Sequence, residues 1–426
     1  MEKINLTFDA TILANSISKN ASRSGIFFTS YQIAKHLMSN SNINLSFFCS
    51  EKKQTSLRMI HDFQDIPVYP YVSIFDTWYV QMRTNKQIAK RNNKLVKKIF
   101  WHYLLFFTKL PFNICNFIIK KLCQKFKVES ELFLSPMFSP INGQKSINSQ
   151  KRYILLYDAI PLLYPEYYPQ IKNGKYWLLD VVNCLKSDSS IHAFAISEQT
   201  KKDFLKFVPG LKSEQITVTP LACSDAFHPC SKEETLKSLE KYNLPTDKRY
   251  VFSLCSLEPR KNLIRAVKTF IEFIKKNKIE DMVFILGGGH WEDFIGKLDK
   301  EIEGLGEYKN KIIKAGYIDD EDLAPLYSGA EWFVYTSQYE GFGLPPLEAM
   351  ACGCPVITSN NSSLPEVVGD AGIMIDWDND EQHITAYEDY YFHPELRDEN
   401  HKKGLERAKQ FSWDKTVDLM IKEMMK

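Results

Sequence analysis

Two glutamates flank a glycine-containing loop in the second half of the chain. The stretch from Glu340 to Glu348 reads E-G-F-G-L-P-P-L-E and follows an apolar, strand-like run that ends at Tyr335. Its two prolines suit the first turn of a helix, where a missing N–H group costs little. The free N–H groups of such a loop and helix start form an anion site suited to phosphate. The carboxylates can accept hydrogen bonds from hydroxyl groups, such as those of a sugar and a ribose at the two ends of a diphosphate.

Either glutamate alone has an ordinary structural explanation. The dipole of the adjacent helix favours an acid at position 348, and an acid at position 340 can lie in water. The combination of both acids with the glycine loop favours a binding site.

Two adjacent cations follow another strand-like run, which extends from Tyr250 to Leu254. They are Arg260 and Lys261 in the sequence P-R-K-N. Cations that open a helix are disfavoured by its dipole, so this pair indicates an anion that it neutralises. Arg260 can bind a diphosphate as a fork and Lys261 as a point charge. An ordinary surface pair of basic residues is the alternative.

Strand-like and helix-like patterns alternate in both halves of the chain. Strands are predicted at 4–8, 153–157, 193–196, 216–218, 250–254, 282–286, 311–315, 332–335 and 356–358. Apolar runs separated by amphipathic helices predict parallel sheets. We therefore expect an α/β protein with two doubly wound domains and a ligand in the cleft between them, outside the carboxyl ends of the strands. The charged, proline-containing stretch 227–247 is the predicted linker.

Length and composition limit the class of protein. With 426 residues, 44% hydrophobic and 25% charged, the chain exceeds one typical core and is neither disordered nor fibrous. Its nine cysteines include no C-x-x-C pair, so neither a disulfide framework nor a zinc knuckle is expected. The first residues form a strand-like segment that ends at Asp9 and lacks the pattern of a signal peptide. We expect a cytoplasmic protein.

The formal net charge of +2 conceals a strongly basic segment at 77–128. It contains twelve basic residues and no acidic one, interleaved with aromatic and aliphatic side chains, and is too broken to span a bilayer. This composition favours a helix lying on an anionic membrane surface, peripheral to the inner face of the cell membrane. A solvated helix face over a buried aromatic core is the alternative. A nucleic-acid partner is not expected, because no nucleic-acid-binding motif accompanies the segment.

A glycine-rich sequence, Gly287-Gly288-Gly289, follows one predicted strand. It fails the dinucleotide pattern G-x-G-x-x-G, because the last position is Glu292. A dehydrogenase is therefore not expected, despite the alternation of strands and helices.

Taken together, the motifs resemble the retaining glycosyltransferases of family four, the glycosyl transferases group 1. The resemblance rests on the E-x7-E pattern of Glu340 and Glu348 together with P-R-K-N at 259–262. The similar segments are 257–263, 316–318, 323–330 and 337–375, which includes P-E-V-V-G at 365–369, and, more thinly, 24–26, 157–161, 196–198 and 219–221. Within the family, the sequence most resembles enzymes of bacterial surface-polysaccharide assembly, mannosyltransferases among them.

The resemblance implies the GT-B fold, in which two Rossmann-like domains face each other across a cleft. The expected units are an acceptor-side domain at 1–226 and a nucleotide-sugar-binding domain at 227–411. A C-terminal helix at 412–426 is expected to pack back on the first domain.

The resemblance also implies roles for individual residues. Glu340 would hold hydroxyls of the donor sugar and Glu348 the ribose, while Arg260 and Lys261 would stabilise the departing diphosphate. Asp158 is the expected acceptor-side catalytic residue. The loop of Gly341, Phe342, Gly343 and Leu344 would hold the phosphates and the sugar, and Gly25 would let the loop of the first domain approach them. Tyr317 and Ile318 would face the base. No metal or cofactor is expected, because Arg and Lys supply the positive charge.

Two positions depart from the family pattern. Tyr157 stands where many members carry a histidine, which leaves the role of the adjacent Asp158 open. Cys255 stands where some relatives have an arginine, so Arg260 would carry more of the diphosphate charge.

The expected function is retaining transfer of a hexose, with mannose favoured, from a nucleotide-diphosphate sugar to a glycan or lipid-linked glycan acceptor. The expected pathway class is lipopolysaccharide O-antigen, capsule or exopolysaccharide biosynthesis. Two alternatives stay open. Tyr157 is consistent with a catalytically silent sugar-nucleotide-binding subunit, and an epimerase would keep the fold but would need an acid/base set that the sequence does not show.

Overall fold

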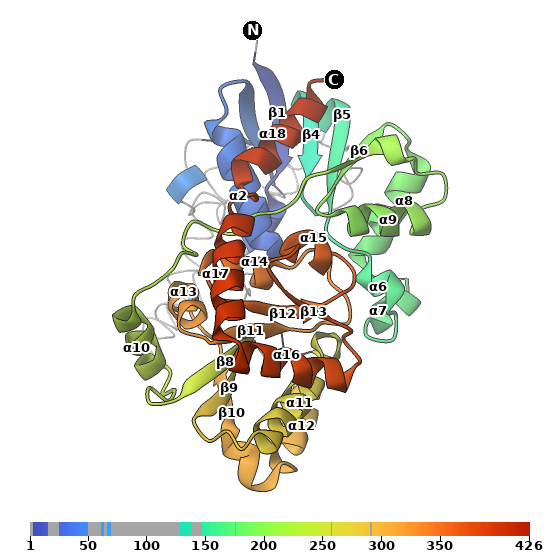
Figure 1. Ribbon diagram of the computed structural model, residues 1–426. Helices are drawn as coiled ribbons and strands as arrows, with labels where there is room; N and C mark the ends of the chain where they lie inside the picture. Colours follow the sequence, from blue (N-terminus) through green and yellow to red (C-terminus); the bar gives the residue numbers. More distant parts are fainter. Residues whose placement is uncertain are drawn as a thin grey trace, which may run out of the picture.

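The protein consists of two α/β domains, each built on its own sheet (Figure 1). The computed structural model describes residues 3–15, 25–49, 61–63, 66–69, 128–137, 147–174, 176–256, 258–289 and 292–426. Except for Val128, the predicted basic segment 77–128 lies outside these residues. Within the described part of the chain, no helix has both the length and the apolar character needed to cross a bilayer.

The first domain contains a seven-stranded sheet in which all neighbouring strands are parallel. Its order is β3-β2-β1-β4-β5-β6-β7. The strands are β1 Ile4–Asp9, β2 Ile43–Phe48, β3 Val68–Tyr69, β4 Val128–Ser135, β5 Ile147–Leu156, β6 Ile191–Ala195 and β7 Ile216–Val218. The helices are α1 Thr11–Asn15, α2 Gly25–Ser39, α6 Ile160–Leu163, α7 Pro169–Lys172, α8 Trp177–Ser187 and α9 Glu198–Phe207.

The second domain contains a six-stranded parallel sheet with the order β10-β9-β8-β11-β12-β13. The strands are β8 Arg249–Leu254, β9 Met282–Gly287, β10 Ile312–Gly316, β11 Trp332–Tyr335, β12 Val356–Ser359 and β13 Gly372–Ile375. The helices are α10 Lys232–Lys241, α11 Leu263–Lys276, α12 Glu292–Glu303, α13 Asp320–Ser328, α14 Leu344–Ala351, α15 Leu364–Val368, α16 Asp380–Phe392 and α17 Pro394–Ala408, and the chain ends with α18 Trp413–Met424.

Three strands of the second sheet are buried along their whole length. Every residue of β9, β11 and β12 is buried. Strands covered by helices on both faces form continuous apolar runs of this kind, because no alternate residue meets water. The prediction of two parallel, doubly wound domains is therefore confirmed.

Chain order reverses at the centre of each sheet. In the first sheet the reversal lies between β1 and β4, and in the second between β8 and β11. Ligands of open α/β sheets bind outside the carboxyl ends of the strands at such a point. The site should therefore lie near the ends of β8 and β11.

The prediction of a linker over 227–247 is wrong in its extent, because helix α10 occupies the middle of this stretch. Ser231 caps the helix by accepting a hydrogen bond from the N–H of Glu234, whose carboxylate accepts from the N–H of Ser231 at 2.7 Å. This capping box satisfies two amides that would otherwise lack partners. A charged composition therefore marks an exposed helix here.

The C-terminal helix α18 lies against the first domain, after α17 has run along the second (Figure 1). It packs on α2, and Thr416 donates a hydrogen bond to the carbonyl of Pro220 at 2.5 Å. Glu423 accepts one from Thr217, on β7, at 3.2 Å. Buried Trp413 begins the helix beside the boundary between the domains.

Candidate functional site

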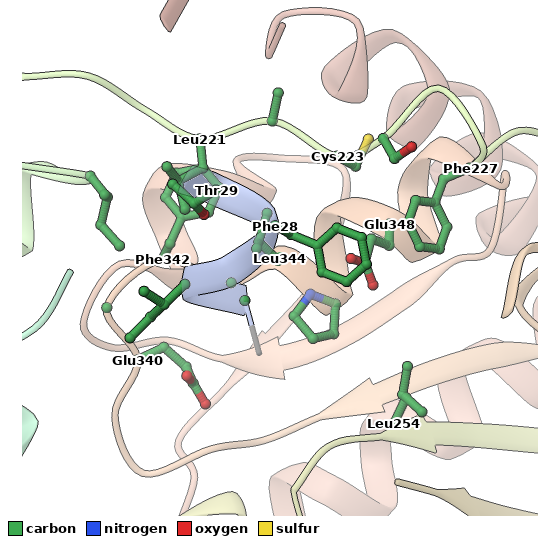
Figure 2. A pocket seen from close by; sticks show the side chains of 18 of the residues that line it. Phe28, Thr29, Leu221, Cys223, Phe227, Leu254, Glu340, Phe342, Leu344 and Glu348 are labelled. Carbon is green, nitrogen blue, oxygen red and sulfur yellow. The ribbon is translucent and has the colours of Figure 1, made fainter. Parts of the chain in front are cut away.

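A cavity of about 470 Å³ lies between the two domains at the carboxyl ends of their strands. Its walls come from the residues that follow β5, β6, β8 and β11 and from the start of α2. Nine residues predicted from the sequence line it: Gly25, Asp158, Lys261, Glu340, Gly341, Phe342, Gly343, Leu344 and Glu348. In Figure 2, Phe28 and Leu344 lie between Glu340 and Glu348.

Lys261 and Glu340 form a buried ion pair in the cavity wall. The ammonium of Lys261 lies 2.7 Å from Oε1 of Glu340 and donates a second hydrogen bond to the Tyr335 hydroxyl at 2.6 Å. Both charged side chains are less than one-tenth exposed. Burial alone would raise the pKa of Glu340, but Arg260 and Lys261 lower it to about 2. Glu340 is therefore a carboxylate at neutral pH.

Arg260 forms a second ion pair with Glu340. Its guanidinium lies 3.1 Å from Oε1 of Glu340 and 2.7 Å from Oε1 of Glu258, and also donates to the carbonyl of Tyr339. It is not among the residues that line the cavity. Its Nε is buried and has no hydrogen-bond partner among the described residues. The structure thus brings Arg260 to Glu340, while Lys261 is the cation on the cavity wall.

The two cations precede the helix rather than open it. Residues Pro259–Lys261 form a short 3-10 turn, and α11 begins at Leu263. Asn262, between them, has a left-handed backbone conformation with φ 58°. This bend directs the 260–261 pair toward the 340 loop.

Asp158 reaches the cavity from the end of β5. Its Oδ1 accepts a hydrogen bond from the N–H of Ile160 at 2.9 Å, which holds the carboxylate against the start of α6. Burial raises the pKa of Asp158, and the positive charge of Arg260 opposes this rise. Asp158 therefore lies within the electrostatic field of the Arg260, Lys261 and Glu340 group.

Glu348 projects into the cavity from α14, apart from the cations. The hydroxyl of Tyr327 donates to its Oε2 at 3.2 Å. Desolvation raises the pKa of Glu348 to about 7, and the hydrogen bond from Tyr327 offsets this effect only in part. A desolvated carboxylate of this kind is an acceptor for hydroxyl groups.

The loop between the two glutamates fits closely against the first domain. A Cβ atom at Gly341 would lie 2.6 Å from the carbonyl oxygen of Tyr157 and 2.8 Å from Cβ of Asp158. Gly343 has φ 125° and precedes α14 directly. Pro345 and Pro346 have no N–H group, and the N–H of Leu347 donates to the carbonyl of Gly343, so at the start of α14 the N–H of Leu344 is the one without an acceptor in the helix.

Tyr317 and Ile318 are not on the cavity wall. Tyr317 is 64% exposed, and Ile318 is buried in the core, where its side chain would contact a Cβ at Gly287. Other side chains that the sequence did not suggest form the wall instead: Phe28, Thr29, Leu221, Cys223 and Phe227. Nothing in their local spacing distinguishes these residues from ordinary core positions.

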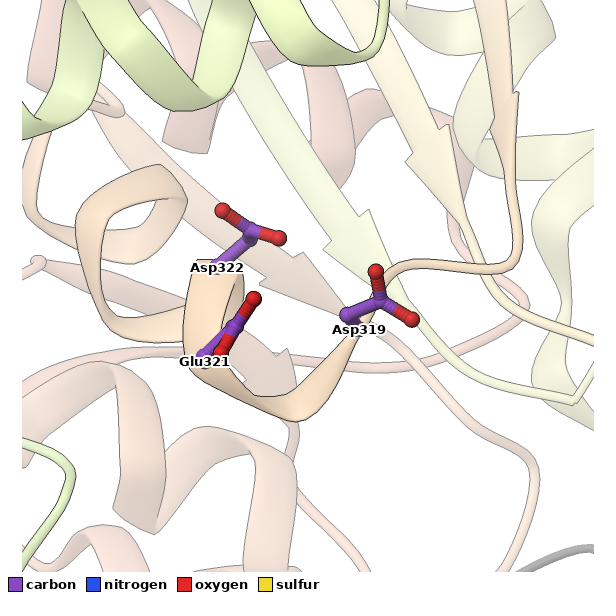
Figure 3. A group of neighbouring side chains, drawn as sticks. All are labelled: Asp319, Glu321 and Asp322. Carbon is purple, nitrogen blue, oxygen red and sulfur yellow. The ribbon is translucent and has the colours of Figure 1, made fainter.

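A separate group of acids, Asp319, Glu321 and Asp322, lies at the start of α13 (Figure 3). Their carboxylate oxygens are close enough to share a cation. The ammonium of Lys241 lies among them, at 3.0 Å from Asp319 and 3.4 Å from Glu321, and also contacts Asp322. The ammonium of Lys241 already contacts all three carboxylates, so this group does not point to a metal site.

Residues 234–407, which include the 260–261 pair and both glutamates, match the family model of the glycosyl transferases group 1. This segment is therefore similar to the glycosyl transferases group 1. It includes every strand of the second sheet, and the structure has the GT-B fold that the resemblance implied.

The chain is also similar to bacterial mannosyltransferases. The chain is 36% identical over 255 residues to O-antigen chain mannosyltransferase B of Escherichia coli, covering 59% of this chain and 64% of that protein. It is 29% identical over 278 residues to the serotype-specific mannosyltransferase WbdA of E. coli, covering 64% of this chain and 33% of that protein. The alignments thus span less than two thirds of either relative.

The fold extends beyond residues 234–407 to the whole chain. The structure of Anabaena Alr3699/HepE in complex with UDP and glucose superposes with a TM-score of 0.66 at 16% identity, covering 98% of both chains. This similarity shows that both domains, and not only the second, follow the same architecture.

Proposed function

We propose that the protein is a retaining, metal-independent glycosyltransferase. It would transfer a hexose, with mannose favoured, from a nucleotide-diphosphate sugar to a glycan or lipid-linked glycan acceptor in surface-polysaccharide synthesis. The observation that carries the proposal is the buried pairing of Lys261 and Arg260 with Glu340 beside one interdomain cavity. The mannosyltransferase relatives support the choice of mannose, and the structural neighbour with UDP and glucose supports a nucleotide-sugar donor.

The two carboxylates define the orientation of the donor in this proposal. Glu348 accepts hydrogen bonds from the ribose, and Glu340 accepts them from hydroxyls of the sugar. The diphosphate lies between them, against the start of α14 and the ammonium of Lys261. Lysine carries three N–H donors, and Lys261 uses two of them on Tyr335 and Glu340, so one stays available to a phosphate oxygen.

The reaction exchanges one bond at the anomeric carbon of the sugar. The bond to the diphosphate oxygen breaks, and a bond to the acceptor oxygen forms on the same face. The proton of the acceptor hydroxyl passes to the departing diphosphate. Lys261 stabilises the charge that develops on this group, an effect worth about 3–4 kcal/mol for a well-placed donor, and Arg260, which does not line the cavity, contributes its positive charge at longer range.

A donor screen with purified protein tests the proposal. GDP-mannose and the common UDP-sugars are compared by thermal shift and by sugar transfer to a glycan acceptor, with EDTA present throughout. One donor should bind and turn over, and Glu340→Ala should lose turnover. Lys268→Ala is the matched surface control, because Lys268 is half-exposed and paired with Glu301.

The catalytically silent subunit makes the opposite prediction. Tyr157 directs its hydroxyl toward α2, 3.4 Å from Ser30 Oγ and 3.5 Å from the Ile26 carbonyl. If wild-type protein turns over no donor, and Glu340→Ala binds nucleotides as the wild type does, the transferase proposal is wrong.

A further inference from the structure

Two sequence segments with no role in the proposed chemistry meet across the domain boundary. One is Ser197-Glu198 at the start of α9, in the first domain, and the other is Glu366 in α15, in the second. The carboxylate of Glu366 accepts hydrogen bonds from the N–H of Glu198 and the N–H of Gln199, both at 2.8 Å. These are the first two amides of α9, which have no acceptor within their own helix.

The contact has the charge arrangement of a strong cap. An anion is stabilised at a helix N-terminus by the helix dipole and by charge-assisted hydrogen bonds. Ser197 fills the usual capping role within the first domain, since its hydroxyl accepts from the N–H of Thr200 at 3.0 Å. Glu366 thus completes the cap of α9 from the other domain.

A second set of contacts joins the same turn of α9 to the loop at the candidate site. The hydroxyls of Ser197 and Thr200 lie 2.7 and 3.2 Å from the carbonyl oxygen of Gly341. Both hydroxyl side chains are buried. Gly341 directly follows Glu340, so this turn of α9 holds the peptide next to the carboxylate that pairs with Lys261.

Hydrogen bonds within the second domain connect the segment that carries Glu366 to the 340–342 loop. The hydroxyl of Ser363, just before α15, lies 3.0 Å from the carbonyl oxygen of Glu340 and 2.6 Å from that of Phe342. Arg407 of α17 donates to the carbonyls of Glu366 and Val367. Separation of the domains would therefore break the Glu366 and Gly341 contacts together.

We infer that Glu366 is a positioning residue for donor binding. Its hydrogen bonds to α9 link the two domains and so hold the 340–344 loop against the first domain. The inference rests on the proposed function for its substrate, and on the hydrogen bonds above for its geometry. Glu366 touches no reacting atom in this scheme. It acts through α9 and Gly341.

The experiment compares Glu366→Ala and Glu366→Gln with Asp370→Asn in the full chain. Asp370 is a neighbouring acid whose side chain is 84% exposed. Glu366→Ala should raise the donor KM about tenfold, as expected for the loss of charge-assisted hydrogen bonds, with kcat within about twofold of the wild type. Glu366→Gln should give a smaller rise because the amide oxygen keeps one acceptor. Asp370→Asn should match the wild type.

Small-angle X-ray scattering of the nucleotide-free proteins provides a readout that does not need activity. Glu366→Ala should have a larger radius of gyration than the wild type and Asp370→Asn. An unchanged radius of gyration for Glu366→Ala contradicts the inference that Glu366 links the domains. An unchanged donor KM in an active enzyme contradicts it as well. If the wild type transfers no sugar, the proposed function is wrong, but the scattering result still decides whether Glu366 links the two domains.

Discussion

The ammonium of Lys261 lies 2.7 Å from Oε1 of Glu340, although 79 positions separate the two residues in the chain. One follows β8 and the other follows β11, which are neighbours at the centre of the second sheet. Parallel strands place their carboxyl ends along one edge, so side chains that follow them converge. The pair therefore depends on the strand order of this sheet.

Loss of the ammonium at position 261 should damage catalysis more than folding. In Lys261→Ala, Glu340 keeps Arg260 as its partner, while the diphosphate loses the cation on the cavity wall. The transfer rate should fall by about 10²-fold or more, the cost of removing one preorganised donor. Steady-state kinetics beside thermal unfolding checks this, with Lys268→Ala as control. A variant that unfolds like the wild type and keeps its rate would contradict the role.

Donor affinity should depend on pH through Glu348. Its pKa is raised to about 7 by burial, so the carboxylate that accepts the ribose hydroxyls is mostly protonated at pH 6 and ionised at pH 8. Affinity for the nucleotide sugar should rise about tenfold between these values. Isothermal titration calorimetry measures it. Glu348→Gln should bind the donor more weakly, and its affinity should no longer depend on pH. If this variant keeps the pH profile of the wild type, another group is responsible for the pH dependence.

The same carboxyl should make the free protein less stable as the pH rises. The folded state keeps the proton of Glu348 up to about pH 7, whereas the unfolded chain releases it near 4.5. Between these values the folded state binds more protons, so the free energy of unfolding decreases with increasing pH. Chemical denaturation of wild type and Glu348→Gln from pH 5 to 8 tests the sign. The two proteins should differ in slope within this interval and run parallel above it.

A side chain at position 341 should push the domains apart. In Gly341→Ala, the new Cβ would lie 2.6 Å from the carbonyl oxygen of Tyr157, a backbone atom that cannot move aside cheaply. Donor binding should weaken at least about tenfold, because an extra carbon atom in a tightly packed site costs more than about 1 kcal/mol. Gly296→Ala is the matched control, because a Cβ at Gly296 meets nothing within 4 Å. Equal donor binding by both variants would contradict the close fit.

The segment 77–128 should bind anionic membranes, with Val128 its one described residue. Co-sedimentation with phosphatidylserine-containing vesicles should be strong at low salt and should weaken sharply at high salt. Lys94, Lys97 and Lys98 changed together to Glu should release the protein. Neutral vesicles provide the control. If neither salt nor the triple change affects binding, the prediction that this segment binds anionic membranes is wrong.

The alternation of apolar runs and amphipathic helices was enough to predict two parallel sheets. Buried parallel strands need continuous apolar sequence, and that need is visible locally in β9 and β11. Glu340, Lys261 and the glycine loop could also be found from the sequence, because cations and carboxylates near a loop of free amides indicate anion chemistry in any fold.

Other features depend on contacts between distant parts of the chain. The cavity wall at Phe28 and Phe227, the close fit of Gly341 against Tyr157, and the cap that Glu366 places on α9 join the two domains. Tyr317, which was predicted to face the base, is largely exposed and is not among the residues that line the cavity. Local spacing sets the direction of a side chain within its own helix or strand, but packing between the domains decides what that side chain meets. The sequence alone therefore determined the two sheets and the charged groups, and the tertiary structure decided which residues enclose them.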